Sequence, residues 1–396
     1  MMNSDTLDTL DTLDTPAAIV DISRMERNIA TMQKRMDTFG VRFRPHVKTT
    51  KCLDVIRAQL RAGARGVTVS TLKEAEACFA AGIVDILYAV GIVPSKLARA
   101  MALKRLGCDL KLVVDNLAAA EAIVSYCLDE GDAFEVWIEV DTDGHRAGIE
   151  PEQDALLDVA RTLHEGGMRV GGVMAHAGSS YELHTPEALR ALAEQERARC
   201  VRAAERLRES GIDCPTVSVG STPTALSAAN LDGVTEVRAG VYVYFDLVMH
   251  NVGVCRLDDL ALSVLTTVIG HNPEKGWVFV DAGWMAMSRD RGTSKQARDF
   301  QYGLPCAIDG TPIEGHLLIA ANQEHGILTA TDTKPGSMPE STTSASDETD
   351  VTTRFPLGTK LRIFPNHACA TGAQFSEYHA LAPSGELTVW QRLHGW

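Results

Sequence analysis

The stretch VRFRPHVKTTKCLDVIRAQLRAGARGVTVSTLKEAEACFAAGIVDILYAV, residues 41–90, decides the fold class. It alternates short β-rich runs with longer amphipathic stretches of helical periodicity. The same alternation continues along the chain. The predicted strands are 41–47, 65–70, 84–90, 109–114, 134–141, 169–176, 215–220 and 235–240. Eight strands, each followed by a helical segment, predict an α/β fold with a (β/α)8 barrel; a doubly wound open sheet is the alternative, but no charged edge strand interrupts the series.

The sequence pattern changes after about residue 255. Segments such as 261–270, 276–283, 360–367 and 386–393 are short, β-branched and separated by turn residues, which predicts a second, all-β domain. We expect a leader and strand at 1–22 that joins this β-domain, the barrel at 23–254 and the β-domain at 255–396. Residues 329–353 are rich in Ser, Thr, Asp and Pro, and we expect a flexible insertion there.

Composition limits the classes of partner. The formal net charge of −14 over 396 residues argues against a nucleic-acid partner. No apolar run approaches the ~20 residues that a membrane span needs. Nine cysteines without a CxxC pair or a signal peptide predict a reduced, cytoplasmic chain.

Reactive side chains follow the predicted strands, where barrel enzymes carry their active sites. Lys48 comes directly after the first strand and a Pro–His pair. A lysine beside a buried strand can lose its proton more easily than a solvated one, as imine formation requires. A solvated lysine is the alternative, and Lys51 competes for the same role. The loops after later strands add Arg146, His176 and Tyr181.

The segment GSTPT at 220–224 predicts a phosphate site. Gly220 permits close backbone approach, Ser221 and Thr222 can donate hydrogen bonds, and a helix is expected to follow with free N–H groups. Phosphate sites of barrels often combine the loops after strands 7 and 8, and Gly240 lies in the second of these loops. An ordinary Ser/Thr helix cap is the alternative.

The segment NHACAT at 366–371 predicts a metal site in the β-domain. His367 and Cys369 are spaced i, i+2, so in an extended segment both side chains leave the same face. Imidazole and thiolate are good ligands for zinc and similar divalent metals, and two ligands leave positions open to water or substrate. The alternative is a core cysteine beside a hydrogen-bonded histidine. Gln323 and His325 are further candidates, near metal or substrate.

Six motifs occur together and in order: RPHVKT, GSTPT, RAGVY, DAGWMAMSRDRGT, NQEHG and PNHACAT. With them the chain resembles the metal-dependent fold-type III pyridoxal-phosphate (PLP) enzymes, the family of D-serine dehydratases and D-threonine aldolases. The resemblance runs from about residue 14 to the closing RLHGW, apart from the insertion. D-threonine aldolases usually have an aspartate at the position matching Cys369, which favours the dehydratases.

The resemblance implies a role for each matching residue. Lys48 matches the lysine that forms an imine with PLP and then takes the substrate α-proton. The other matching residues are Gly220, Ser221, Thr222, Gly240 and Tyr242 for the phosphate, Arg146 for the pyridine nitrogen, Tyr181 for the cofactor wall, and His367 and Cys369 for the metal. We count His176 as cofactor-binding as well, from its place after the sixth strand.

The implied reaction is elimination of water from a small D-configured β-hydroxy amino acid, with a divalent metal (Zn, Mn or Co) assisting hydroxide departure. The expected substrate is 3-hydroxyaspartate, giving oxaloacetate and ammonia; D-serine and retro-aldol cleavage of D-threonine are the alternatives. Two other functions are considered. An amino-acid racemase needs no metal, so the segment with His367 and Cys369 argues against it. A cofactor carrier of this fold type resembles only the barrel, whereas this chain has a second domain. The fold also implies a homodimer.

Overall fold

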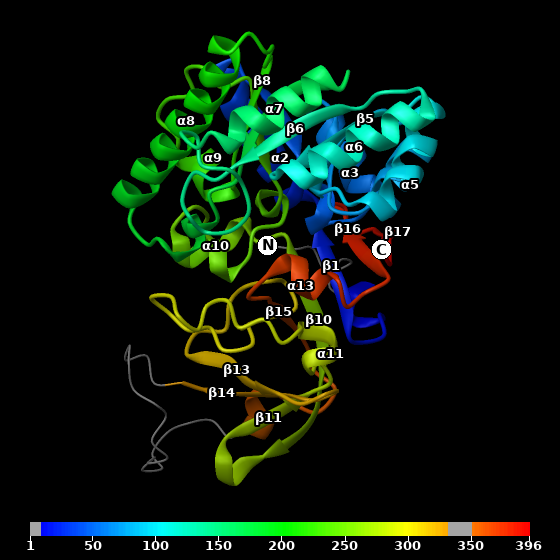
Figure 1. The fold of residues 1–396 in the computed structure, drawn as a ribbon. Helices are drawn as coiled ribbons and strands as arrows, with labels where there is room; N and C mark the ends of the chain where they lie inside the picture. The colour runs from blue at the N-terminus through cyan, green and yellow to red at the C-terminus, as the bar shows by residue number, and fades with distance from the viewer. Residues whose placement is uncertain (1–8, 332–350) are drawn as a thin grey trace. The chain divides into compact units, whose positions relative to one another are not determined.

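The computed structural model describes residues 9–331 and 351–396. The chain forms two compact units, which we describe separately (Figure 1). The barrel unit comprises Ile29–Tyr242 and Leu393–Trp396, and the β unit comprises the chain up to Asn28 together with Val243–Arg392. These limits differ from the barrel limits predicted at residues 23 and 254. The difference at the second limit arises because α10 (Leu247–Val252) binds β-unit backbone, where Leu247 N–H donates to the Pro365 carbonyl.

The barrel unit contains a parallel eight-stranded sheet in the order β2-β9-β8-β7-β6-β5-β4-β3. The strands are β2 (Arg42–Pro45), β3 (Val67–Val69), β4 (Asp85–Gly91), β5 (Asp109–Val114), β6 (Glu135–Val140), β7 (Arg169–Ala175), β8 (Thr216–Val219) and β9 (Glu236–Ala239). A parallel bridge between His46 and Thr68 spans the remaining gap between β2 and β3. The sheet is therefore a nearly closed barrel, which confirms the predicted fold class over the open sheet.

Helices alternate with the strands along the chain and cover the outside of the barrel (Figure 1). They are α2 (Ile22–Phe39), α3 (Leu53–Arg61), α4 (Leu72–Ala80), α5 (Pro94–Arg105), α6 (Leu117–Glu130), α7 (Ala155–Glu165), α8 (Pro186–Glu209) and α9 (Thr222–Ser227). Side-chain caps fix several starts: Thr71, Asn116 and Thr185 each accept a backbone N–H of the following first turn. Such caps satisfy donors that a helix start leaves unpaired.

The barrel interior is packed, so the barrel is not a pore. Leu87, Val113, Trp137 and Met174 form one buried cluster contributed by four strands. Such a filled interior confines ligand chemistry to the ends of the strands.

The β unit contains a nine-stranded, mostly antiparallel sheet with the main path β13-β14-β11-β10-β1-β16-β17, while β15 pairs with β10 and β12. Its strands are β1 (Ala17–Asp21), β10 (Leu262–Asn272), β11 (Trp277–Val280), β12 (Leu304–Cys306), β13 (His316–Ala321), β14 (Gly326–Ala330), β15 (Lys360–Phe364), β16 (Glu377–Leu381) and β17 (Leu387–Gln391). The N-terminal strand β1 lies between β10 and β16, antiparallel to the first and parallel to the second.

Short helices interrupt the β unit: α11 (Trp284–Met287), α12 (Val351–Arg354) and α13 (Ala368–Gly372), besides α10. Most of the predicted insertion at 329–353 lies outside the described residues. No helix in the described part of the chain is both long and apolar enough to cross a membrane.

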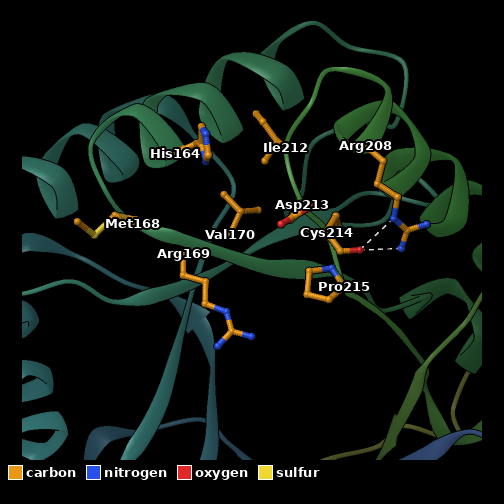
Figure 2. A pocket seen from close by; sticks show the side chains of 9 residues that line it. All are labelled: His164, Met168, Arg169, Val170, Arg208, Ile212, Asp213, Cys214 and Pro215. Atoms are coloured by element: carbon orange, nitrogen blue, oxygen red, sulfur yellow. Dashed lines mark hydrogen bonds between the residues drawn. The ribbon is translucent and has the colours of Figure 1, made fainter.

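A cavity of about 540 Å³ lies at the N-terminal ends of β7 and β8 (Figure 2). Arg208 closes one side of it by donating two hydrogen bonds to the Cys214 carbonyl. The remaining lining residues are His164, Met168, Arg169, Val170, Ile212, Asp213 and Pro215. None of the predicted site residues lines this cavity. It lies at the N-terminal end of the barrel strands, where residues contribute to stability rather than to catalysis.

Candidate functional site

Lys48 lies on a tight turn at the C-terminal end of β2. The turn is a 3-10 helix, η1 (Val47–Thr49), and the His46 imidazole Nδ1 accepts its first backbone N–H, that of Lys48, at 3.4 Å. The Lys48 side chain is exposed, whereas Val47 and Thr49 beside it are buried. The turn therefore presents Lys48 outward from an otherwise packed segment.

Lys51, the competing lysine, is committed to other protein groups. Its Nζ lies 2.9 Å from Oε1 of Glu74, a carboxylate that is almost wholly buried. The same ammonium lies 4.9 Å from the centre of the Trp396 ring. These contacts give Lys51 a structural partner on each side, so the geometry favours Lys48 for chemistry.

A cluster of cations and histidines lies at the C-terminal ends of the barrel strands. Burial, together with the charges of Arg146 and Lys48, lowers the pKa of His176 to about 3. Burial likewise lowers the pKa of His46 well below its ordinary value, with Lys48 and Arg238 as the next causes. Both imidazoles are therefore neutral at physiological pH, because burial and the surrounding positive charge both disfavour the protonated form.

Arg238 is a member of this cluster that sequence reasoning missed. It lies on β9, is buried, and donates to Ser218 Oγ at 2.7 Å and to the Ala175 carbonyl at 2.6 Å. The available signal was a pair of charged residues, Glu236 and Arg238, inside a short strand, because buried charges are rare unless paired. Arg146, by contrast, is exposed, and its nearest carboxylate oxygen, on Glu139, lies 3.9 Å away.

The GSTPT segment forms a tightly bonded corner between β8 and α9. Ser221 caps α9, and its hydroxyl lies 2.8 Å from Ser180 Oγ and 3.0 Å from Thr224 Oγ1. Thr222 Oγ1 accepts the backbone N–H of Tyr242. The helix-cap alternative is thus present in the structure, and α9 has only six residues, which weakens the predicted contribution of a helix N-terminus.

The two glycines of the phosphate prediction lie against backbone. Gly220 has φ +131°, and a Cβ on it would lie 2.1 Å from the Arg238 carbonyl oxygen. A Cβ on Gly240 would lie 3.0 Å from both the His46 carbonyl and Thr49 Oγ1. Gly220 therefore requires a residue without a side chain, and a side chain at Gly240 would have to displace its neighbours, so at both positions a ligand can approach the backbone closely.

Tyr242 and Tyr181 differ in what their side chains face. The Tyr242 hydroxyl accepts a hydrogen bond from Gln59 at 2.8 Å, and the ring packs edge-on against Phe43 in the core. Burial raises the pKa of this hydroxyl. Tyr181 instead lies near His176, with ring centroids 6.2 Å apart. His176 in turn donates from Nδ1 to the Gly220 carbonyl at 2.9 Å, which connects Tyr181 to the glycine corner.

These residues fit an anionic cofactor with an aldehyde. The positive groups of Lys48, Arg146 and Arg238 act on the same pair of histidines, and the glycine corner excludes side chains. An accessible lysine supplies the amine that an aldehyde needs. The barrel mouth therefore suits pyridoxal phosphate in its charge and in its nucleophile.

The predicted metal pair lies in the β unit, where the expectation of an extended segment is wrong. His367 is extended, but it is the N-cap of α13, and Cys369 already belongs to that helical turn. The turn forms because Asp246, buried in the core, accepts the backbone N–H groups of Ala368 and Met249, both at 2.9 Å. The two side chains still meet, since Cys369 hydrogen-bonds to His367.

Asp290 orients His367, and the sequence reading missed this residue. Its Oδ2 lies 2.6 Å from His367 Nδ1, which leaves Nε2 as the nitrogen available to a ligand. Asn366 holds the Asp290 loop, because its side-chain amide donates to the Asp290 carbonyl and accepts from Thr293. An acidic residue in the arginine-rich loop at 288–292 was the signal, but no spacing rule connects it to a histidine far along the chain.

Charge around His367 has the opposite sign to that in the barrel. Burial alone would lower the pKa of His367, but Cys369 and Asp290 together raise it well above its ordinary value. The hydrogen bond with His367 lowers the pKa of Asp290, and burial raises that of Asp246. This part of the β unit thus attracts positive charge.

The donor set fits a divalent metal with an open coordination sphere. Within residues 9–331 and 351–396, no group of three or more His, Cys, Asp or Glu side chains is placed to hold a metal. His367 Nε2 and the Cys369 thiol are two good ligands, and a carboxylate behind the imidazole is the usual support for such a ligand.

Gln323 and His325 are the remaining predicted residues, and two arginines of the 288–292 loop lie in the same unit. Gln323 and His325 are exposed at the tip of the β13–β14 hairpin, where the Gln323 carbonyl accepts the Met285 N–H. Arg289 lies over the Trp284 ring at 4.2 Å. Arg291 donates to Asp299 and Gln301. Neither arginine is simply solvated.

Comparisons with known proteins cover both units. The family described as alanine racemase, N-terminal domain, matches residues 20–248, and the putative serine dehydratase domain matches residues 261–381. D-threo-3-hydroxyaspartate dehydratase from Delftia sp. (strain HT23) is 63% identical over 383 residues, which cover 96% of this chain and 98% of the relative. The chain belongs to this dehydratase family.

Other members of the dehydratase family are more distant. D-serine dehydratase from Dictyostelium discoideum is 29% identical over 94% of both chains, and D-threonine aldolase from Arthrobacter sp. is 30% identical over 90% of this chain and 86% of the aldolase. The solved structure of the Delftia dehydratase covers 98% of this chain and 97–99% of its own with a TM-score of 0.93. These findings confirm the predicted family and the predicted fold.

Proposed function

We propose that this chain is a PLP- and metal-dependent hydro-lyase that acts on D-threo-3-hydroxyaspartate. The identity of 63% with a dehydratase for that substrate, over nearly the full length of both chains, carries the proposal. The net reaction converts the hydroxy amino acid to oxaloacetate and ammonia. The water lost on elimination is regained when the resulting enamine is hydrolysed, so the atoms balance.

Lys48, Arg146, His176, Tyr181, the corner of Gly220, Ser221 and Thr222, Gly240 and the Tyr242 backbone form the cofactor site in this proposal. When bound, PLP supplies an electron sink for the substrate α-carbon. Lys48 anchors it and, once free, takes the α-proton on Nζ. His46 and His176 are neutral, so the cations around them can bind anionic groups of the cofactor and the substrate. Arg238, buried beneath, adds to that charge.

His367 and Cys369 form the metal site in this proposal, with Asp290 orienting His367. A bound zinc, manganese or cobalt ion would supply a Lewis acid for the departing hydroxyl. Solved structures of D-threo-3-hydroxyaspartate dehydratase support this assignment: they include a histidine-to-alanine variant and, in the metal-free form, a variant with a cysteine two positions further replaced by alanine. His367 and Cys369 have the same spacing. Gln323 and His325 are the candidates for contact with substrate.

The proposal also covers the oligomeric state, the domain limits and the cellular location. We infer a homodimer, from the resemblance to fold-type III enzymes. We infer that the two domains span 23–254 and 255–396, close to the family matches at 20–248 and 261–381, although the compact units of the structure divide the chain at other residues. None of the nine cysteines, all of which lie in the described part of the chain, forms a disulfide, which supports a reducing, cytoplasmic location.

Product analysis tests the proposed activity. The protein, supplied with PLP and each of zinc, manganese and cobalt, is incubated separately with D-threo-3-hydroxyaspartate, D-serine and D-threonine. We expect oxaloacetate and ammonia from the first substrate at the highest kcat/KM. Pyruvate formed faster from D-serine would reassign the substrate. Glycine with glyoxylate, or glycine with acetaldehyde from D-threonine, would reassign the reaction to retro-aldol cleavage.

A further inference from the structure

The turn that carries Lys48 ends in a strained residue. Lys51 has φ +45°, a left-handed backbone conformation that is uncommon outside glycine. Its backbone N–H donates to the Val47 carbonyl at 2.8 Å, and Thr50 N–H donates to the same oxygen. Lys48 lies inside this hydrogen-bonded loop. A strained backbone conformation of this kind persists only where surrounding contacts hold it in place.

The Lys51 side chain is bound to a rigid part of the barrel. Its partner Glu74 is 1% exposed and completes the first turn of α4. Glu74 N–H donates to Thr71 Oγ1, and Glu74 Oε2 accepts the Ser70 N–H at 2.8 Å. The carboxylate is thus fixed before Lys51 reaches it. The ion pair anchors Lys51 to the C-terminal end of β3, next to its own strand β2.

A segment from the end of the chain closes over the same residue. Leu393–Trp396 groups with the barrel although the chain before it belongs to the β unit. Leu393 N–H donates to the Lys51 carbonyl at 2.6 Å, and the Trp396 ring lies 4.9 Å from Lys51 Nζ. Trp396 is 86% exposed, so its ring contributes little to a core. Its position over Lys51 is explained by cation–π attraction.

We propose that Lys51 is a positioning residue for Lys48, and that Leu393–Trp396 is the latch that holds it. Glu74 fixes the Lys51 side chain, Leu393 fixes its carbonyl, and Trp396 covers its ammonium. Together they keep the left-handed backbone of Lys51, and the turn back to Val47 then sets the direction of Lys48. The inference rests on the proposed role of Lys48 as cofactor anchor.

Two ligands separate positioning of Lys48 from general damage to the barrel. PLP binds through its phosphate and through the lysine, whereas pyridoxine 5′-phosphate lacks the aldehyde and can use only the non-covalent contacts. The affinities of the full-length, cofactor-free protein for both are measured for the wild type, Trp396→Ala, Lys51→Met, Lys51→Arg and a chain ending at Arg392. Trp277→Ala is the matched control, because Trp277 makes a similar contact with Lys275 in the β unit.

We expect Trp396→Ala to weaken PLP binding about two- to fivefold, the value of one exposed cation–π contact. Removal of Leu393–Trp396 and Lys51→Met should weaken it about tenfold or more, and Lys51→Arg should restore most of the affinity. The affinity for pyridoxine 5′-phosphate should stay at the wild-type value throughout. Trp277→Ala should change neither. If Lys51→Met unfolds because Glu74 loses its counter-charge, Lys51→Met/Glu74→Gln carries the same test.

Backbone hydrogen exchange of residues 47–51 gives a second readout that does not depend on cofactor. It should accelerate in the latch variants and not in Trp277→Ala. Unchanged exchange, or equal loss of both ligands, would overturn the positioning role. Borohydride reduction of wild-type protein with PLP and peptide mapping separates this failure from another: label on a lysine other than Lys48 would refute the proposed anchor itself.

Discussion

Histidines in the two units of this molecule experience opposite electrostatic surroundings. In the barrel, burial lowers the pKa values of His46 and His176, and the neighbouring cations Lys48, Arg146 and Arg238 act in the same direction. In the β unit, His367 lies beside Cys369 and Asp290, and its pKa is raised. The same side chain is therefore kept neutral in one unit and attracts positive charge in the other.

The difference indicates what each unit can bind. A group of cations with neutral imidazoles is suited to phosphate and carboxylate groups, since any anion relieves the repulsion there. An imidazole and a thiol backed by a carboxylate are suited to a metal cation, which replaces the proton between them. The barrel groups thus suit the cofactor of the proposed elimination, and the β-unit groups suit its metal.

The largest expected effect comes from removing the barrel nucleophile. Lys48→Ala should lower kcat on D-threo-3-hydroxyaspartate by about 10³-fold or more, because anchor and base are lost together. Metal content, measured by elemental analysis, should stay at the wild-type value if the two sites are separate. Lys275→Ala, in the β unit, is the control. Activity near the wild-type level in Lys48→Ala would exclude the assignment.

Substitution of Asp290 tests whether the charges in the β unit support metal binding. Asp290→Asn should weaken metal affinity by about 10- to 100-fold, the usual cost of losing the group that orients a histidine ligand. PLP affinity should not change. Asp299→Asn in the same loop, where Asp299 accepts from Arg291, is the matched control. Metal titration with a competing chelator measures the difference, and equal affinities in the two variants would remove Asp290 from the site.

The barrel histidines should make the cofactor-free protein sensitive to acid. Below pH 6.5 the unfolded chain takes up a proton on His176, whereas the folded protein does so only near its pKa of about 3. The folded state therefore loses stability as pH falls through this window. His176→Gln should flatten the decline in the urea midpoint between pH 7 and pH 5. The exposed His164→Gln is the control, and an equal slope in both would contradict the neutral-imidazole account.

The smallest expected effect concerns Tyr242, which the resemblance assigned to the phosphate. Tyr242→Phe removes a buried hydrogen bond to Gln59 and should lower the free energy of unfolding by about 1 kcal/mol. Because the hydroxyl faces the core, PLP affinity should not change. A large loss of PLP affinity with unchanged stability would return the hydroxyl to the cofactor site.

The periodicity of apolar residues and the position of reactive residues after strands were sufficient to predict the fold, because eight βα repeats allow few topologies. The same logic found Lys48, which follows a strand directly, whereas His367 was predicted from its spacing to Cys369. It could not choose between Lys48 and Lys51, since that choice depends on a buried glutamate and a segment more than 300 residues away in the chain.

Long-range contacts also explain why the sequence alone did not reveal the roles of Asp290 and Asp246. Asp290 reaches His367 across 77 positions, and Asp246 forces the turn at α13 across 122. No local pattern contains either pairing. The i, i+2 rule predicted that His367 and Cys369 share a face for a wrong reason, because the segment is helical at Cys369.

Chelation of the cofactor-loaded protein tests the central claim most directly, that the barrel holds the PLP and the β unit separately holds the metal. Visible absorbance and turnover of D-threo-3-hydroxyaspartate are followed together as a chelator is added and as zinc, manganese or cobalt is restored. The account predicts that turnover falls to background and returns with metal, while the absorbance stays constant. Turnover that survives complete metal removal, or absorbance lost together with the metal, would contradict it.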